Sequence, residues 1–336
     1  MAAINLHFAR FVTLIWWVLL AGGHAESLSG DGRSVGTGGA LPEYIPVPGV
    51  SGNLNSIGSD TLSNLMTLWA EGFQAQYPNV NIQIEGKGSS TAPPSLIQGT
   101  AQLGPMSREM KASEIESFRR EFGYPPTRIL VALDALAIYV HKDNPLRRIR
   151  IEELDAIYSN THYSGEAPIR RWGQLGLDAV WQARPLSVYG RNSASGTYGF
   201  FKERVLKNGD FHNSVQEQPG SSALIWGVST NLFGIGYSGI GYKTSGVKVL
   251  ELSANGGPYF APSYGNVVAG RYPLSRALQL YVNKIPGEPL DPLVVEFIRY
   301  ILSREGQATV VRDGYFPLPP GTVERILKNL GVGNGS

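Results

Sequence analysis

The chain contains no cysteine, which excludes disulfide bonds and a lipid anchor attached to a cysteine. Histidine is also scarce, with His7, His24, His141, His162 and His212 as the five examples. They form no cluster with acidic residues at metal-site spacing, so we expect no metal and no other cofactor. Neither sign of charge dominates, because 29 lysines and arginines oppose 27 aspartates and glutamates. The composition therefore excludes a broad nucleic-acid-binding surface.

The most apolar stretch of the chain lies at its N-terminus. Arg10 precedes apolar residues 11–20, and a small-x-Ala cleavage site follows at residues 23–25. This pattern predicts a secretory signal peptide over residues 1–25, because the apolar stretch is shorter than the ~20 residues that a membrane span takes. The next residues are small, polar and rich in glycine, and we expect a flexible leader over 26–48. A periplasmic or secreted protein follows.

From residue 49 onward, alternating apolar runs interleave with helical patterns, which predicts an α/β protein with mostly parallel sheets. A chain of 336 residues, 42% of them hydrophobic, can build one large core or two modest ones, and we expect two. The apolar run 130–140, interrupted only by Asp134, is typical of a strand that leaves one domain and enters another. The other predicted strands include 80–84, 101–103, 186–189, 233–237, 247–252 and 277–282, and the predicted helices include 113–122, 150–159, 197–206, 221–230, 291–302 and 304–313.

The loop at residues 191–197 has the composition of an anion site. It joins a predicted strand to a predicted helix, and backbone N–H groups at a helix N-terminus lack partners where the helix dipole favours negative charge. Gly196 would let a ligand approach the backbone, and Ser195 and Thr197 can donate hydroxyl protons. Arg191 adds a planar fork that stays charged. Taken alone, the loop is equally consistent with a capped turn beside a surface arginine.

Similar chemistry recurs at three further strand-to-helix junctions, at residues 58–61, 86–91 and 104–108. In the first, Ser59 or Asp60 is the natural N-cap of the helix that follows. In open α/β sheets, ligands bind beyond the carboxyl ends of strands, where all four loops lie. We therefore expect one ligand site built from several loops, each of which presents donors rather than bases or nucleophiles.

Together, these motifs resemble the periplasmic phosphate-binding proteins of bacterial phosphate ABC transporters. The resemblance covers nearly the whole mature chain, and it is specific through the order and context of the motifs rather than through any one of them. The runs that carry it are residues 58–62, 88–91, 106–108, 131–137, 191–197, 234–237, 272–276 and 302–308.

This resemblance implies a two-lobed, type II periplasmic-binding-protein fold with an interlobe ligand cleft. Lobe 1 would comprise residues 49–136 plus 265–336, and lobe 2 residues 137–264, with crossings near 135–140 and 253–277. The implied function is high-affinity binding of inorganic phosphate in the periplasm, for delivery to a membrane-embedded ABC transporter permease. We expect a monomer that is not an enzyme.

The implied phosphate ligands come from all four loops, and Arg108 is added as a second cation. Relatives commonly place an aspartate where this chain has Ser107, and that aspartate accepts a proton from bound phosphate. Sulfate has no such proton at neutral pH, so a buried carboxylate disfavours it. Our hypothesis is that Asp60 takes this role, and a helix cap is the alternative. The predicted site residues are Ser59, Asp60, Thr61, Ser89, Ser90, Ser107, Arg108, Arg191, Ser195, Gly196 and Thr197.

Two other functions remain open at this point. A secreted phosphatase of the same fold would need an activated nucleophile or metals, and Ser89 and Ser195 have no evident base in the sequence. A receptor for another tetrahedral oxyanion, such as molybdate, an organophosphonate or a phosphorylated metabolite, would use the same donors. The G-x-G-x-x-G run at 234–239 lacks the helix that a dinucleotide site requires, so it predicts close packing of a strand instead.

Overall fold

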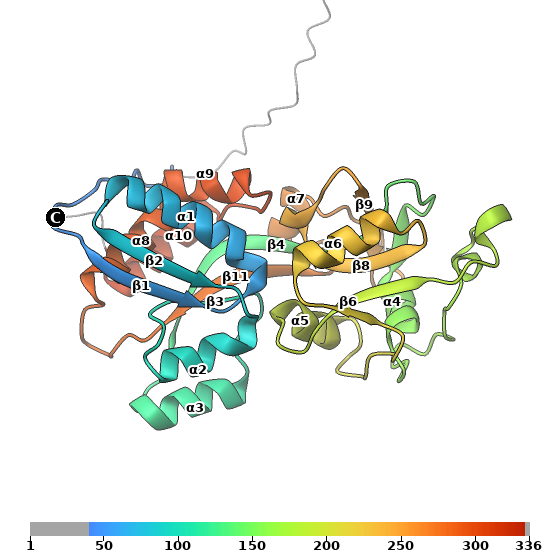
Figure 1. Ribbon diagram of the computed structural model, residues 1–336, viewed down its shortest axis with the longest axis horizontal. Helices are drawn as coiled ribbons and strands as arrows, with labels where there is room; N and C mark the ends of the chain where they lie inside the picture. Colours follow the sequence, from blue (N-terminus) through green and yellow to red (C-terminus); the bar gives the residue numbers. More distant parts are fainter. Residues whose placement is uncertain (1–39, 333–336) are drawn as a thin grey trace, which may run out of the picture. The chain divides into compact units, whose positions relative to one another are not determined.

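The computed structural model describes residues 40–332, which belong to one compact unit (Figure 1). The predicted signal peptide and residues 26–39 of the predicted leader lie outside the described residues. The prediction of a flexible leader is wrong for residues 40–48, because Leu41 and Tyr44 pack against a hydrophobic core. The Tyr44 backbone N–H also donates to the Glu305 carboxylate at 3.1 Å. No helix in the part of the chain that the structure describes is long and apolar enough to cross a membrane.

Helices and strands alternate along most of the chain, as the sequence predicts (Figure 1). The α-helices are α1 (Ser63–Gln76), α2 (Ala92–Ile97), α3 (Ala112–Phe122), α4 (Ile151–Tyr158), α5 (Gly196–Arg204), α6 (Ser221–Thr230), α7 (Tyr264–Val268), α8 (Pro292–Leu302), α9 (Arg304–Arg312) and α10 (Pro320–Leu330). The strands are β1 (Gly52–Ile57), β2 (Val80–Glu85), β3 (Gly104–Met106), β4 (Thr127–His141), β5 (Arg148–Arg150), β6 (Ser187–Arg191), β7 (Gln216–Gln218), β8 (Gly234–Gly239), β9 (Val247–Val249), β10 (Glu251–Ser253) and β11 (Ser275–Val282). Short 3-10 helices are η1 (Asp60–Leu62), η2 (Ser89–Thr91), η3 (Trp172–Leu175), η4 (Ala179–Trp181) and η5 (Ile240–Tyr242).

Two predicted strands differ from those observed. The strand predicted at 101–103 lies three residues later, as β3. The strand predicted at 247–252 is divided into β9 and β10, which pair with different strands in different sheets. The glycine-rich run at 234–239 forms β8 and is followed by η5 rather than by an α-helix, so the prediction of a packed strand is confirmed.

The 15-residue strand β4 is central to a seven-stranded sheet of order β3-β11-β4-β8-β6-β7, and β9 also pairs with β4. The partners of β4, which are β8, β9 and β11, all run antiparallel to it. By contrast, β6 pairs in parallel with β7 and β8, and the two-stranded sheets β1–β2 and β5–β10 are parallel. The sheet is therefore mixed around β4 rather than mostly parallel. The reason is that one strand carries the chain from one core to the other and a second strand brings it back. These two strands run in opposite directions.

The two largest of four hydrophobic clusters lie along this central sheet, and we call them the first and second cores. The first is built largely by α1, α8, β4 and β11, and the second by α4, α5, β4 and β8. Strand β4 contributes Ala132 to the first core and Ala135 to the second. On the returning chain, Leu274 belongs to the second core and Leu278 to the first. Strands β4 and β11 therefore connect the two cores, as the apolar run at 130–140 predicts.

Local sequence explains how the helices of the first core begin and pack. Asp291 caps α8, because its Oδ1 accepts from the backbone N–H groups of Leu293 and Val294, and Pro292 occupies the first helical position. Gly72 lies where α1 meets α8, and a Cβ there would lie 2.0 Å from the Tyr300 hydroxyl oxygen. The close approach of these two helices thus depends on glycine.

We expect the Phe297→Ala substitution to lower the free energy of unfolding by about 3–5 kcal/mol, because it leaves a cavity in a closely packed core. Phe297 is fully buried and packs edge-on against Phe73, with ring centroids 5.4 Å apart. Val311→Ala, at a residue that is 56% exposed on the neighbouring helix α9, should change it by less than about 0.5 kcal/mol. Urea denaturation measures both, and equal small losses would contradict the placement of the core.

Candidate anion-binding site

Buried hydroxyl groups from separate loops meet at one place. Ser59 follows β1, Ser89 follows β2 and Ser107 follows β3. Ser59 Oγ donates to Ser107 Oγ at 3.0 Å, and the Ser107 backbone N–H donates to Ser89 Oγ at 3.0 Å. Thr61 Oγ1 lies 3.0 Å from Thr197 Oγ1, which belongs to α5. All five residues are 2% exposed or less, so this hydroxyl cluster is closed to solvent.

The first turn of α5 is in direct contact with the hydroxyl cluster. Ser195 is the N-cap, and its Oγ accepts from two backbone N–H groups of that turn, at 3.1 and 3.3 Å. A Cβ on Gly196 would lie 2.2 Å from Ser89 Oγ and 2.6 Å from Ser107 Oγ. Glycine is therefore required at this position, and the positive end of the α5 dipole lies against the hydroxyl groups.

Arg191 and Asp60 form an ion pair beside this cluster. Arg191 Nη1 lies 3.0 Å from Asp60 Oδ2 and donates to Ser221 Oγ at 2.7 Å. Ser221 is the first residue of α6, and its backbone N–H and its hydroxyl both donate to Asp60 Oδ2, at 2.9 and 2.8 Å. The carboxylate of Asp60 thus lies at the N-terminus of α6, where the helix dipole stabilises negative charge.

These contacts overturn the alternative that Asp60 is a side-chain helix cap. Neither η1 nor α1 has a side-chain hydrogen bond at its N-cap, because the Asp60 carboxylate is bound to α6 instead. The backbone of its loop is held by two phenols, since Tyr242 donates to Asp60 O and Tyr315 donates to Thr61 O, both at 2.9 Å. Burial first, and then the charge of Asp60, raises the pKa of Tyr242 well above its ordinary value, so this phenol keeps the proton that it donates.

Two of the predicted site residues, Arg108 and Ser90, contact each other beside the loop at 191–197. Arg108 makes a bidentate pair with Glu114, with Nη1 and Nη2 at 2.8 and 2.7 Å from the two carboxylate oxygens. Arg108 Nη2 also donates to Ser90 Oγ at 3.1 Å. The carboxylate of Glu114 at the start of α3 therefore neutralises the charge of Arg108, and its role as a second cation of the site stays a prediction.

The cation that joins the hydroxyl cluster is Arg276, which the sequence analysis did not predict as a site residue. Its Nη1 donates to Ser107 O at 3.0 Å and to Thr197 Oγ1 at 3.1 Å. Its Nε donates to Asp134 Oδ2 at 2.8 Å, and both residues are buried. The signal for this pair was the aspartate in the apolar run 130–140, because a buried carboxylate needs a positive partner. Only the pairing of β11 with β4 identifies that partner.

Two cavities adjoin the ion pair of Arg191 and Asp60. One of about 510 Å³ is lined by Asp60 together with Lys243, Asp313 and other residues of α1 and η5. The other, of about 400 Å³, is lined by Arg191, by Tyr198 of the first turn of α5, and by residues between α5 and β7, including Phe211. One cavity therefore lies beside Asp60 and the other beside Arg191.

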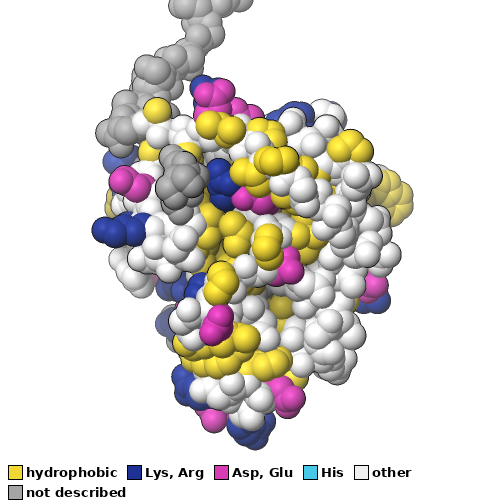
Figure 2. Space-filling view, turned by 90° about the vertical axis from the view of Figure 1, so that its left-hand side faces the viewer, with side chains coloured by type: hydrophobic (Ala, Val, Ile, Leu, Met, Phe, Trp, Pro, Cys, Tyr) yellow, Lys and Arg dark blue, Asp and Glu magenta, His cyan; other side chains and the backbone are white. Residues whose placement is uncertain are grey.

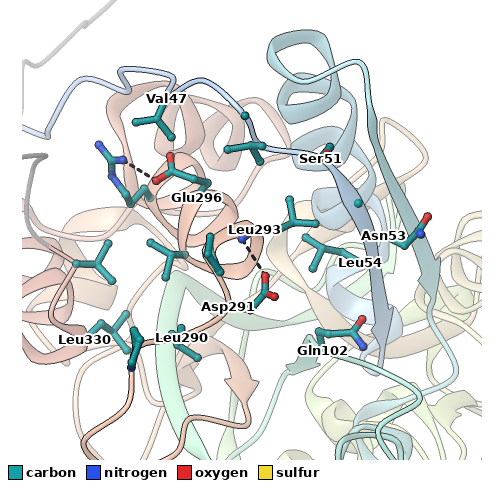
Figure 3. A pocket seen from close by; sticks show the side chains of 18 of the residues that line it. Val47, Ser51, Asn53, Leu54, Gln102, Leu290, Asp291, Leu293, Glu296 and Leu330 are labelled. Carbon is teal, nitrogen blue, oxygen red and sulfur yellow. Dashed lines mark hydrogen bonds and ion pairs between the residues drawn. The ribbon is translucent and has the colours of Figure 1, made fainter.

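A groove of about 920 Å³ elsewhere in the protein contains none of the predicted site residues (Figure 3). Its charged groups are already paired, because Asp291 caps α8 and Glu296 lies 2.7 Å from Arg299. Figure 2 shows hydrophobic side chains gathered on one face of the molecule. Without convergent unpaired donors, this groove lacks the chemistry of an anion site. Among its lining residues are Val47, Val50, Leu290, Leu293 and Leu330.

Within the described residues, two serines of the site, Ser89 and Ser195, are engaged in hydrogen bonds with other site groups. Residues 40–332 contain no group of three or more histidines and acidic residues that could hold a metal. Ser195 Oγ already accepts two backbone hydrogen bonds as a helix cap. Ser89 Oγ contacts Ser107 and no basic side chain within the described residues. Both hydroxyl groups are therefore already engaged in hydrogen bonds within the site.

The Gly196→Ala substitution tests the contact between α5 and the hydroxyl cluster. Its Cβ would collide with Ser89 and Ser107, so we expect the free energy of unfolding to fall by about 1–3 kcal/mol. Gly265→Ala, in α7 where a Cβ meets nothing within 4 Å, is the matched control and should be neutral or slightly stabilising. Both values follow from chemical denaturation, and an unchanged Gly196→Ala variant would refute the close approach of these loops.

The chain is similar to proteins of a known family. Residues 46–305 match the model of the PBP superfamily domain. The phosphate-binding protein PstS of Pseudomonas aeruginosa is 54% identical over 295 residues, which is 87% of this chain and 91% of that protein.

Solved structures show the same fold. A chain described as a phosphate ABC transporter substrate-binding protein with bound phosphate, from Clostridium perfringens, is 25% identical, with a TM-score of 0.68 over 80% of this chain and all of that one. An ABC-type phosphate transport receptor from Vibrio cholerae, 23% identical, has a TM-score of 0.61 over 79% of this chain and all of that one. The chain therefore belongs to the PBP superfamily and, within it, to the family of the PstS proteins, with the two-lobed type II fold that its motifs imply.

Proposed function

We propose that this protein binds inorganic phosphate with high affinity in the periplasm and delivers it to the membrane-embedded permease of an ABC transporter. The observation that carries the proposal is the convergence of buried hydroxyl groups and the α5 N-terminus from loops of both cores. Its relatives are named for phosphate binding and phosphate transport. We also propose that residues 1–25 are a cleaved signal peptide and that the mature protein is a monomer.

The donor set matches what a dehydrated anion requires. An enclosed phosphate loses its water, and charge-assisted hydrogen bonds return roughly 1.5–3 kcal/mol each. After desolvation and closure, a net of about 8 kcal/mol corresponds to a micromolar dissociation constant. Arg191 supports this role, because it is 2% exposed and its Nε has no hydrogen-bond partner within the described residues. This Nε–H group can therefore donate a hydrogen bond to phosphate.

We propose that the two hydrophobic cores are the two lobes, and that phosphate is held where their loops meet. Strand β4 passes from one core to the other between Ala132 and Ala135, just before the predicted outward crossing near 135–140. We place the return crossing between Leu274 and Leu278, at the end of the predicted range 253–277 and later than the predicted lobe boundary at residue 264. The contacts of Thr61 with Thr197 and of Asp60 with Ser221 then join one lobe to the other.

A calorimetric titration of the mature protein, stripped of bound anion, with phosphate, sulfate and arsenate tests the proposal. We expect micromolar or tighter phosphate binding and no turnover of a phosphomonoester assayed in parallel. Arg191→Ala should weaken phosphate binding at least tenfold, which is roughly 1.4 kcal/mol. Arg304→Ala, at an exposed ion pair with Glu43, should leave it unchanged. Weak binding with steady hydrolysis would favour the phosphatase, and preference for another oxyanion would favour that ligand.

Asp60 is our candidate for the proton-accepting carboxylate that distinguishes phosphate from sulfate. Its Oδ2 accepts the bonds from α6 and Arg191, and no hydrogen bond within the described residues reaches Oδ1. That oxygen has lone pairs for the phosphate proton, whereas sulfate would face an unpaired negative charge.

We expect Asp60→Asn to reduce the ratio of phosphate to sulfate affinity, because an amide does not repel sulfate. The ratio is the relevant quantity, since loss of the contacts to α6 weakens both anions together. Asp313→Asn is the matched control, because Asp313 lines the same cavity and is hydrogen-bonded to Asn64. Competition titrations measure the ratio, and an unchanged value in Asp60→Asn would remove Asp60 from this role.

A further inference from the structure

Arg276 and Asp134 form a buried ion pair where the chain passes between the two cores. The two residues face each other in the antiparallel pairing of β11 with β4. Arg276 Nε donates to Asp134 Oδ2 at 2.8 Å, and Nη2 lies 2.7 Å from the same oxygen. Asp134 Oδ1 accepts from the backbone N–H of Ile240 at 3.0 Å. A buried pair of this kind contributes little net stability, so its position beside the site loops is the informative feature.

The Nη1 group of Arg276 contacts loops from both cores. It donates to the carbonyl oxygen of Ser107, after β3, and to Oγ1 of Thr197, in α5. The side chain of Arg276 is 2% exposed, and its guanidinium carbon lies 5.5 Å from the centroid of the Phe200 ring. This one nitrogen atom therefore connects the loop after β3 with α5 inside the hydroxyl cluster.

Both oxygen atoms that Arg276 binds carry lone pairs that would repel an anion. A carbonyl oxygen can only accept, and a hydroxyl oxygen has two lone pairs besides its single proton. A guanidinium can only donate, so it occupies lone pairs on Ser107 O and Thr197 Oγ1. The positive charge also turns the hydroxyl proton of Thr197 away from Arg276, because that proton carries positive charge itself. The loops are then left with donors to present.

We propose that Arg276 is a positioning residue of the anion site. It binds acceptor atoms of the loop after β3 and of α5, so that the hydroxyl and N–H donors of these two segments face the bound oxyanion. The inference rests on the proposed phosphate binding. Asp134 holds the guanidinium in place, and Arg276 acts on the ligand through Thr197 and Ser107 rather than by touching it.

The paired substitution Asp134→Asn with Arg276→Gln tests this role, because it removes both charges together and leaves two amides that can hydrogen-bond. We expect a folded protein whose dissociation constant for phosphate rises at least tenfold in calorimetry. The matched control is Glu296→Gln with Arg299→Gln, which removes another largely buried ion pair in α8, away from the hydroxyl cluster. The control should fold and bind phosphate as the original protein does.

A double-substitution cycle with Thr197→Val separates positioning from a general structural effect. In the original protein, loss of the oriented hydroxyl should weaken phosphate binding about tenfold or more. In the Asp134→Asn, Arg276→Gln background, the same change should cost less than about threefold, because the hydroxyl is no longer oriented. Fully additive losses would refute the positioning role, and so would a folded paired variant with the original affinity.

Two further measurements keep the test decisive. If the paired variant does not fold, Arg276→Lys replaces it in the cycle, because an ammonium retains the charge but lacks the planar fork that spans Asp134, Ser107 and Thr197. An unchanged dissociation constant for Thr197→Val alone would also overturn the proposal, since it requires that hydroxyl. Failure of the original protein to bind phosphate would instead refute the proposed function, and that titration is made first.

Discussion

The antiparallel pairing of β4 with β11 is the constraint on which the rest of this structure depends. Each strand contributes to the connection between two separate hydrophobic cores, so the pair fixes where loops of one core meet loops of the other. Its register also places Arg276 opposite Asp134, in the interior where neither charge could remain alone. The same pair of strands therefore supplies the connection between the cores and a cation beside the candidate site.

The chemistry of the site follows from a balance of donors and acceptors. Hydroxyl groups and the first turn of α5 provide hydrogen-bond donors in a region closed to solvent. Three backbone acceptors in the same region are satisfied, because Arg276 binds Ser107 O and two phenols bind the backbone oxygens of Asp60 and Thr61. Such an arrangement disfavours a neutral or cationic ligand and favours an oxyanion, without a large overall charge on the protein.

Asp60 connects the two cores in a second way. Its carboxylate lies at the N-terminus of α6 and beside Arg191, so a residue of the first core's loop is bound by the second. A carboxylate in this position shares its Oδ2 among three donors and retains Oδ1 for a further partner. In our proposal, contact between the cores and recognition of a protonated anion therefore depend on this one side chain.

Much of the fold and part of the site follow from local sequence. Helix α6 has the predicted bounds, and the loop at 191–197 lies at a helix N-terminus, because periodicity, caps and glycine act over a few residues. The roles of Arg108 and Arg276 could not be predicted in this way. Each arginine is assigned by a partner, Glu114 for one and Asp134 for the other, and in the second case that partner lies on another strand.

The sequence by itself determined that this is an α/β chain with hydroxyl-rich loops at the ends of strands, and its ordered motifs determined the family. Only the tertiary structure decided which cation joins the hydroxyl cluster, that the sheet is mixed around β4, and that Asp60 binds α6 rather than capping its own helix. The reason is physical. Strand register and buried charge pairing join residues far apart in the chain, whereas secondary structure depends on neighbours.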